Sequence, residues 1–183
     1  MACNTIRTFE LDLCQPSLGG IKKVYLAEWK ADAATITVTG KEGATEIDKL
    51  VEGSVSAFGD DIVWKEYPMR KNTASMTSTL NNSTEGASYV TTELAMVFSK
   101  METQKRIAVQ ALAIGQAMAV VEDSNGKRWF LGANEPLTAT AGTGETGTAK
   151  ADRNAYTITL TDESLGYPFE IEEGVNLKQT EEA

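Results

Sequence analysis

The chain has 183 residues, of which 42% are apolar, and it carries two cysteines, no histidine and a formal net charge of −9. Without histidine, neither a Ser-His-Asp nor a Cys-His catalytic arrangement can form, and two cysteines are too few for a zinc site or a disulfide framework. The negative charge argues against an ordinary nucleic-acid-binding surface, which needs clustered lysine and arginine. We therefore expect a single domain, 1–183, that is no enzyme and holds no metal or cofactor.

Targeting signals are not apparent in the sequence. No apolar run approaches the roughly 20 residues that a membrane helix requires. The segment Met1–Thr8 lacks the apolar region of a signal peptide. We expect a protein made in a cytoplasm, with no membrane partner.

Three alternating runs in the first third of the chain predict strands: Ile21–Trp29, Thr35–Thr39 and Ile62–Tyr67. The segment 40–61 between the last two is rich in glycine, serine and acidic residues. We interpret it as a loop that serves as an interaction arm, or as a segment that conceals a strand. Its weakly apolar residues are Ile47, Leu50 and Val51.

A long hairpin is the most distinct feature of the sequence. Its strands, Arg70–Leu80 and Tyr89–Phe98, alternate between apolar and polar residues, which predicts one dry face and one wet face. Both apolar sets reach the core only if Leu80 and Val90 share a face. The wet face carries Thr73, Ser75, Thr77, Thr79, Thr91 and Glu93. Solvent alone explains such a face in a lone hairpin; the alternative is a functional surface.

A helix is predicted directly after the hairpin. Ser99 and Glu102 have the spacing of a capping box, and Gly115 is suited to end the helix. Its apolar stripe comprises Ile107, Ala108, Ala111, Leu112 and Ile114. We expect this helix to pack on the core.

The last third of the chain predicts a second hairpin and a final strand. An Asn-Gly pair between Ala117–Glu122 and Lys127–Leu131 indicates a type I′ turn. The small polar segment Leu137–Arg153 is expected to be a long loop with at most a short strand, and Tyr156–Leu160 is the last strong strand. The acidic segment 173–183 is expected to be frayed. About eight strands and one flanking helix predict a mainly β fold, either a β-sandwich or a barrel.

Two further patterns in the sequence bear on function. Gly142–Gly147 matches a dinucleotide-binding fingerprint letter for letter, but no helix follows it, so we reject a nucleotide site. The tryptophans Trp29, Trp64 and Trp129 fall in predicted strands, where we expect core or interface anchors rather than sugar platforms.

Three segments carry a resemblance to a known family: Gly19–Ala27, Met118–Gly132 with its Asn-Gly-Lys turn and Trp-Phe-Leu-Gly end, and Gly142–Leu160. In these segments and in the order of its elements, the chain resembles the major tail tube proteins of long-tailed bacteriophages, especially phages of Bacteroides-like hosts. The resemblance rests on pattern, since the family has no invariant chemical signature.

The resemblance implies a structural virion protein whose hexameric rings stack into a tube. In that family, long strands of each copy join across subunits into one inner barrel, so 70–98 would supply lumen strands and 40–61 would reach the next ring. A lumen of threonine, serine and glutamate would let DNA pass without binding it. The implied partners are other copies, other tail proteins and DNA in transit, and the implied location is the virion tail.

Two alternatives remain open at this stage. One is a monomeric β-sandwich that binds carbohydrate or a protein through its tryptophan-bearing strands. The other is a different virion protein, such as a tail terminator or a decoration protein.

Overall fold

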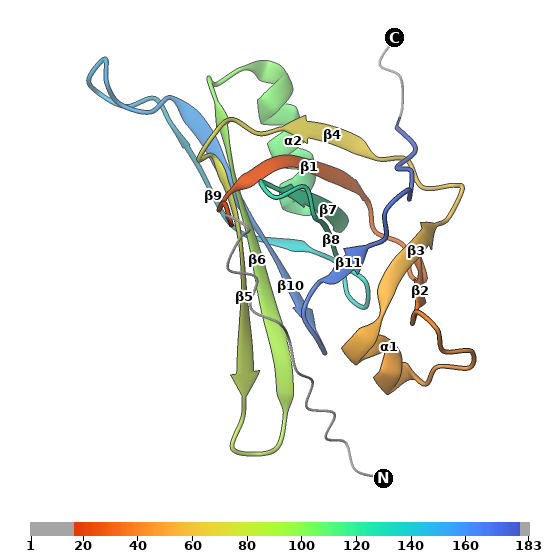
Figure 1. The fold of residues 1–183 in the computed structure, drawn as a ribbon. Coiled ribbons are helices and arrows are strands. Elements are labelled where there is room, and N and C mark those ends of the chain that lie inside the picture. Colours follow the sequence, from red (N-terminus) through yellow and green to blue (C-terminus); the bar gives the residue numbers. More distant parts are fainter. Residues whose placement is uncertain (1–16, 180–183) are drawn as a thin grey trace.

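The computed structural model describes residues 17–179, which form eleven strands and two helices. Seven strands form one mixed sheet in the order β2-β3-β11-β8-β7-β1-β4, and four form an antiparallel sheet in the order β5-β6-β10-β9 (Figure 1). The seven-stranded sheet comprises β1 (Ile21–Glu28), β2 (Ala34–Thr37), β3 (Ser54–Phe58), β4 (Lys65–Pro68), β7 (Ala117–Asp123), β8 (Arg128–Leu131) and β11 (Phe169–Ile171). The four-stranded sheet comprises β5 (Ala74–Asn82), β6 (Ser88–Ser99), β9 (Thr138–Glu145) and β10 (Ala155–Ser164). The helices are α1 (Glu46–Glu52) and α2 (Thr103–Ile114).

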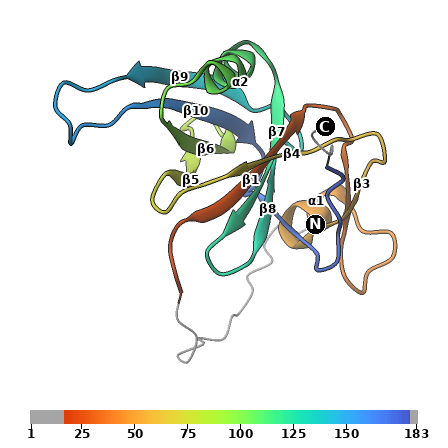
Figure 2. The same ribbon diagram turned by 90° about the horizontal axis from the view of Figure 1, so that it is seen from above.

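The prediction of a mainly β fold is confirmed, the barrel alternative is excluded, and the predicted number of helices is wrong. Neither sheet closes into a barrel, because no hydrogen-bonded pair joins the first and last strand of either sheet. The described residues also hold two helices where the sequence predicted one. Figure 2 shows α2 beside β9 and β10, so this helix does flank the four-stranded sheet.

The main core lies between the two sheets. Val24, Leu26 and Ala119 of the seven-stranded sheet meet Leu94 and Ile158 of the four-stranded sheet, all of them nearly or wholly buried. The apolar residues of β6 and β10 recur at every second position because alternate side chains of a strand point to one face. This alternation makes one face of the four-stranded sheet dry.

A second core lies on the opposite face of the seven-stranded sheet. Trp64 lies in this core and is 1% exposed, and the rings of Phe58 and Trp64 lie 5.1 Å apart in an edge-on contact. Phe130 completes this aromatic group, 5.1 Å from Phe58. Strands β1 and β7 therefore have core on both faces, which explains the uninterrupted buried run Ala117–Val121.

The predicted hairpin and its register are confirmed. β5 pairs with β6 so that Leu80 lies opposite Val90, and residues directly opposite in an antiparallel pair share a face. On its other side β6 pairs with β10, so that Val90 lies opposite Ser164 and Ser99 opposite Ala155. The hairpin is thus one half of the four-stranded sheet.

Over 40–61 the expectation of a loop is wrong, whereas the alternative of a concealed strand is confirmed. The segment contains α1 and β3, and β3 pairs with both β2 and β11. Thr45 caps α1: its Oγ1 accepts a hydrogen bond from the Asp48 backbone N–H at 3.2 Å, and the Asp48 carboxylate accepts one from the Thr45 N–H at 2.8 Å. This is a capping box with aspartate at its third position, a signal the sequence contains.

The predicted start and packing of α2 are also wrong in part. Ser99 belongs to β6, and Glu102 is the N-cap residue, with no side-chain capping bond. No residue of α2 is fully buried: Val109 and Leu112 pack against the main core, whereas Ile107 and Ile114 are exposed. The helix thus covers the edge of the core with one narrow stripe.

Three smaller predictions in the last third need correction. Leu137–Arg153 is not mainly a loop, because it contains the eight-residue strand β9. The turn after β7 is not type I′, since a positive φ occurs at Gly126 (87°) but not at Asn125. The tail is not frayed over 173–179, where Val175 and Leu177 pack against the second core, while 180–183 lie outside the described residues.

Candidate functional site

The candidate site is the exposed face of the four-stranded sheet, which we call the outer face. It carries the odd-numbered residues of β5, β6 and β10 and their neighbours on β9. Five of the six residues predicted for the wet face lie on these strands: Ser75, Thr77, Thr79, Thr91 and Glu93. Thr73 directly precedes β5, and its backbone C=O accepts a hydrogen bond from the Val97 N–H at 2.8 Å. The structure therefore brings the predicted residues together on one surface.

The register places these side chains in rows across the sheet. Thr77 lies opposite Glu93, and Thr79 lies opposite Thr91. The Asn81 Nδ2 donates a hydrogen bond to the Thr91 Oγ1 at 2.8 Å, which fixes part of this surface. On β5 the side chains of the face are exposed, so nothing among residues 17–179 shields them.

The sequence prediction missed half of the outer face. β10 adds three threonines and a glutamate in alternation, Thr157, Thr159, Thr161 and Glu163. β9 adds hydroxyls as well, since the Thr140 and Thr161 Oγ1 atoms lie 2.8 Å apart as a hydrogen-bonded pair. The alternation of threonine with alanine in Thr138–Ala141 is the signal that could have revealed β9 as a strand.

The charge of this sheet is of one sign. None of its four strands contains lysine or arginine, whereas they contain four carboxylates, Glu93, Glu145, Asp162 and Glu163. Glu93 and Glu163 are exposed on the outer face. The face is therefore a neutral-to-acidic, hydroxyl-rich surface without a cation of its own.

A buried polar row runs beneath this surface, on the dry face. Ser78, Thr92 and Asp162 lie side by side on β5, β6 and β10, and the Ser78 Oγ and Thr92 Oγ1 are hydrogen-bonded at 2.9 Å. Asp162 is 4% exposed, and its Oδ2 accepts a hydrogen bond from the Gly132 N–H at 3.0 Å. Burial raises the pKa of the Asp162 carboxyl to about 6, and its Oδ1 has no hydrogen-bond partner among the described residues.

Gly144 shows why glycine recurs in 142–147, a segment that could be mistaken for a phosphate loop. A Cβ on Gly144 would lie 2.9 Å from the Tyr156 ring, so the strand can pack there only without a side chain. Gly142 and Gly144 belong to β9, whereas the dinucleotide-binding fingerprint requires a loop that leads into a helix. The connection that follows is held by the Asp152 carboxylate, which accepts hydrogen bonds from the Thr148 and Ala149 N–H groups.

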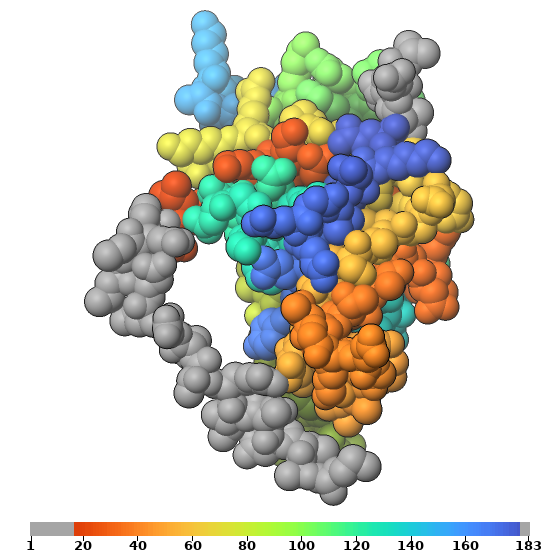
Figure 3. Space-filling model, turned by 45° about the vertical axis from the view of Figure 1, so that its right-hand side comes forward, coloured from red at the N-terminus to blue at the C-terminus, as the bar shows by residue number. Residues whose placement is uncertain are grey.

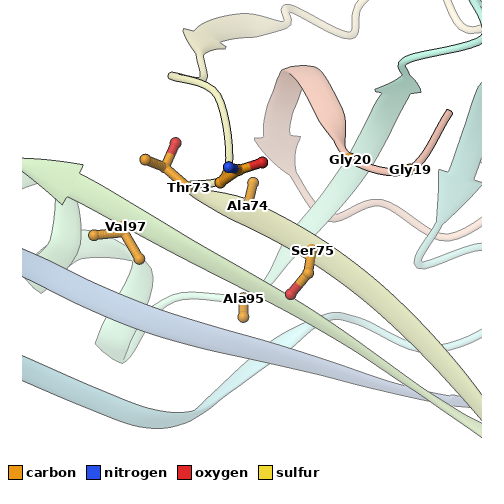
Figure 4. Close-up of a pocket in the computed structure, with 8 residues that line it drawn as sticks. Gly19, Gly20, Thr73, Ala74, Ser75, Ala95 and Val97 are labelled. Atoms are coloured by element: carbon orange, nitrogen blue, oxygen red, sulfur yellow. The ribbon is translucent and has the colours of Figure 1, made fainter.

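A hollow of about 280 Å³ lies beside the first residues of β5 (Figure 4). It is lined by Gly19, Gly20, Asn72, Thr73, Ala74, Ser75, Ala95 and Val97. No ionisable side chain lines it, so it offers no acid, base or metal ligand. Among the described residues there is also no cluster of three or more carboxylates, cysteines or histidines that could hold a metal ion.

The residues predicted for the inter-ring loop lie on α1. Ile47 and Val51 are 59% and 52% exposed, while Leu50 packs against the second core. They form one apolar side of a short helix, not a loop patch. Their proposed contact with a neighbouring ring stays a prediction.

The three tryptophans pack in or beside the two cores. Trp64 is buried, and the Trp29 Nε1 donates a hydrogen bond to the Gly132 carbonyl oxygen at 3.0 Å. Trp129 is half-buried on β8 and packs against the main core. None of the three offers the broadly exposed ring that a sugar platform needs.

No family model matches this chain, and no curated protein matches it in sequence. No helix in the described part of the chain is long and apolar enough to cross a membrane.

Proposed function

We propose that this chain is the structural subunit of a bacteriophage tail tube, in which copies join edge to edge into a ring and the outer face lines the lumen. The observation that carries the proposal is the four-stranded sheet itself. Within residues 17–179, nothing pairs with the outer edge of β5 or of β9. Two open edges on one regular sheet favour pairing with further copies, because unpaired edges are otherwise prone to aggregate.

The directions of the edge strands suit such pairing. Neighbouring strands alternate in direction through the sheet, so β5 and β9 run antiparallel to each other. If β9 of one copy lies beside β5 of the next, the antiparallel order continues without a break. Repeating the same contact closes a ring when the rotation between copies is a simple fraction of a turn, and the family resemblance suggests six copies.

The backbone groups at the edge of β5 can be assigned. Because the Val97 N–H bonds to the Thr73 C=O, the odd-numbered residues of β5 face β6. The N–H and C=O groups of Ala74, Met76, Ser78 and Leu80 then point to the open edge. These are the groups that β9 of a neighbouring copy would meet.

The surface chemistry supports a conduit for DNA. Affinity for a duplex arises when lysine and arginine neutralise phosphates, and the four strands contain neither residue. Exposed glutamates among small hydroxyl side chains repel phosphate and give a passing duplex no firm contact. Besides its own copies, the chain's partners under this proposal are other tail proteins and DNA in transit, all within the virion tail.

Electron microscopy of the purified protein tests the proposal. We expect rings or hollow tubes for the natural sequence. Leu80→Pro removes an N–H from the open edge while leaving the bonds to β6 intact, so we expect it to abolish rings. Leu80→Ala is the matched control, since it shortens the same half-exposed side chain but keeps the N–H, and it should still form rings.

Two results would count against this function. A strict monomer at high concentration, unchanged by Leu80→Pro, would contradict edge pairing and favour the monomeric binding module. Rings that never stack would retain edge pairing but favour a tail terminator over a tube subunit.

A further inference from the structure

The two ends of the subunit differ in charge. The strands of the four-stranded sheet run from one end to the other, with Val90 opposite Ser164 near one end and Ser99 opposite Ala155 near the other. Nine residue steps of β6 separate these rows, roughly 30 Å at about 3.3 Å per residue. Figure 1 shows α1 and the tip of the β5–β6 hairpin at one end, and α2 with the β9–β10 connection at the opposite end.

The acidic end consists of segments 41–52, 82–88 and 163–167. They contain six carboxylate residues and two lysines: Glu42, Glu46, Asp48, Glu52, Glu85 and Glu163, with Lys41 and Lys49. Both lysines are engaged locally, Lys41 with Asp48 at 2.5 Å and Lys49 with Glu46 at 2.9 Å. The end therefore presents net negative charge.

Apolar side chains lie among these acids. Ile47 and Val51 on α1 are exposed, and so are Leu165 (69%) and Tyr167 (58%) after β10. The two groups adjoin, because a Cβ on Gly166 would lie 2.7 Å from the Leu50 Cδ1. Figure 3 shows α1 and its flanking loop, in orange, forming the lower right of the molecule. Large exposed apolar residues gathered in this way are typical of a contact surface.

The basic end consists of segments 70–73, 99–107 and 145–154. They contain seven cationic residues and three carboxylates: Arg70, Lys71, Lys100, Lys105, Arg106, Lys150 and Arg153, with Glu102, Glu145 and Asp152. The Lys100 N–H donates a hydrogen bond to the Asn154 C=O, which joins 99–107 to 145–154, and Thr73 is bonded to Val97 of β6, two residues before 99–107. In a chain of net charge −9, a net positive end is a marked asymmetry.

We propose that the acidic end of one subunit docks on the basic end of the next along the tube axis, so that axial stacking is head-to-tail and electrostatic. This inference rests on the proposed function. It adds which surfaces of the subunit meet when rings stack, in which direction the rings are oriented, and that stacking depends on salt. The partner is a second copy because the two ends of the same chain are complementary in sign. A contact between two different surfaces of identical copies propagates without limit, as a tube requires.

Charge reversal tests the inference. Glu42→Lys with Glu85→Lys reverses two exposed acids, and Arg106→Glu with Lys150→Glu reverses two exposed cations at the other end. Each double variant brings the net charge of one end close to zero, and we expect it to form rings but to stack on the order of tenfold less than the natural sequence in low salt, because the attraction between opposite charges is lost. In an equimolar mixture, the unaltered basic end of one variant can meet the unaltered acidic end of the other, so mixed pairs of rings should form that neither variant forms alone and that a misfolded variant would not form.

A matched control reverses charges on the sides of the subunit. Lys30→Glu with Lys127→Glu changes the net charge by the same amount as the basic-end variant, and both lysines lie outside the two ends, in exposed pairs with Asp61 and Glu170. Such exposed pairs contribute at most about 1 kcal/mol each, so the fold should persist. We expect this variant to stack like the natural sequence, and stacking of the natural sequence should fall as added salt shortens the screening length.

The outcomes separate the two proposals. Rings that stack equally well in all variants would overturn the electrostatic contact while leaving the ring. Loss of duplex-DNA binding in the basic-end variant, with stacking unchanged, would assign the basic end to DNA and overturn the contact between copies. If the natural sequence forms no rings, the proposed function fails. The contact between the two ends can then still be tested by sedimentation, which compares the mixture of the two double variants with each variant alone. If the mixture associates no more than the separate variants do, the contact is overturned.

Discussion

The seven-stranded and four-stranded sheets differ in how many of their faces are buried. β1 and β7 have core on both faces, and their buried residues run without alternation. β6 and β10 alternate between buried and exposed residues, because one face meets the core and the other remains open. The seven-stranded sheet, buried on both faces at β1 and β7, mainly stabilises the fold, whereas the open face of the four-stranded sheet is available to bind a partner.

The largest expected effect is in the second core. Phe130→Ala should lower the free energy of unfolding by about 3–5 kcal/mol, because it removes a ring that packs edge-on against Phe58 and Trp64. Urea unfolding measures this loss. Thr159→Ala on the outer face is the comparison, and its effect should stay near zero. Equal losses would contradict the difference between the sheets.

Asp162 lets pH probe the dry face of the four-stranded sheet. Its folded pKa of about 6 lies above the ordinary value of 3.8, so the folded state binds the proton more tightly than the unfolded state does. Stability should therefore fall as pH rises from about 4 to above 6, by up to about 3 kcal/mol at 1.36 kcal/mol per pKa unit. Asp162→Asn should remove this fall and be more stable than the natural sequence at pH 7.

The control for this prediction is the same pH series on Glu163→Gln, one residue along on the open face. Because Glu163 is exposed and is the smallest of the causes that raise the Asp162 pKa, its replacement should leave most of the fall in stability between pH 4 and 6 in place. A fall that survives Asp162→Asn but vanishes in Glu163→Gln would contradict the assignment to the buried carboxyl.

Gly144 tests how closely β9 packs. Gly144→Ala would place a Cβ 2.9 Å from the Tyr156 ring and should cost about 1–3 kcal/mol. Gly142→Ala meets only the Thr157 carbonyl oxygen, at 3.5 Å, and should cost less than about 1 kcal/mol. Thermal unfolding of the two variants compares them directly, and the reverse order would show that β9 does not pack as described.

The smallest effect on stability, and the sharpest on function, is expected on the outer face. Thr77→Lys with Thr91→Lys should change the free energy of unfolding by less than about 1 kcal/mol, since Thr77 is exposed and Thr91 half-buried. If these residues line a lumen, the added cations should bind phosphate and stall DNA delivery by assembled tails. Normal infectivity with a stable fold would remove the basis for the lumen assignment.

Local patterns predicted what depends on neighbours in sequence. The alternation of β5 and β6 was sufficient for their register, because a slip by one residue would expose Val90, Leu94 and Met96 to water. The outer-face positions Ser75 to Thr79 follow from the same argument. The sequence prediction missed α1, although the Thr45–Asp48 spacing was visible, because its apolar stripe is short and partly exposed.

Some elements depend on distant partners, and the sequence carries only a weak signal for them or none. β11 has three residues and exists because Phe169 and Glu170 pair with β8 while Ile171 pairs with Val55. β9 is poor in large apolar residues and becomes a strand through its long pairing with β10. A short or weakly apolar segment has too little preference of its own, so tertiary contacts decide its state.

The sequence by itself therefore determined the absence of histidine chemistry, the negative charge and a half-wet hairpin of fixed register. Only the tertiary structure decided that this hairpin pairs with two further hydroxyl-rich strands, that within residues 17–179 the sheet they form has two open edges, and that charges far apart in the chain gather at opposite ends. The physical reason is that alternation depends on residues adjacent in the sequence, whereas the edges and ends of a sheet depend on contacts between residues far apart in the sequence.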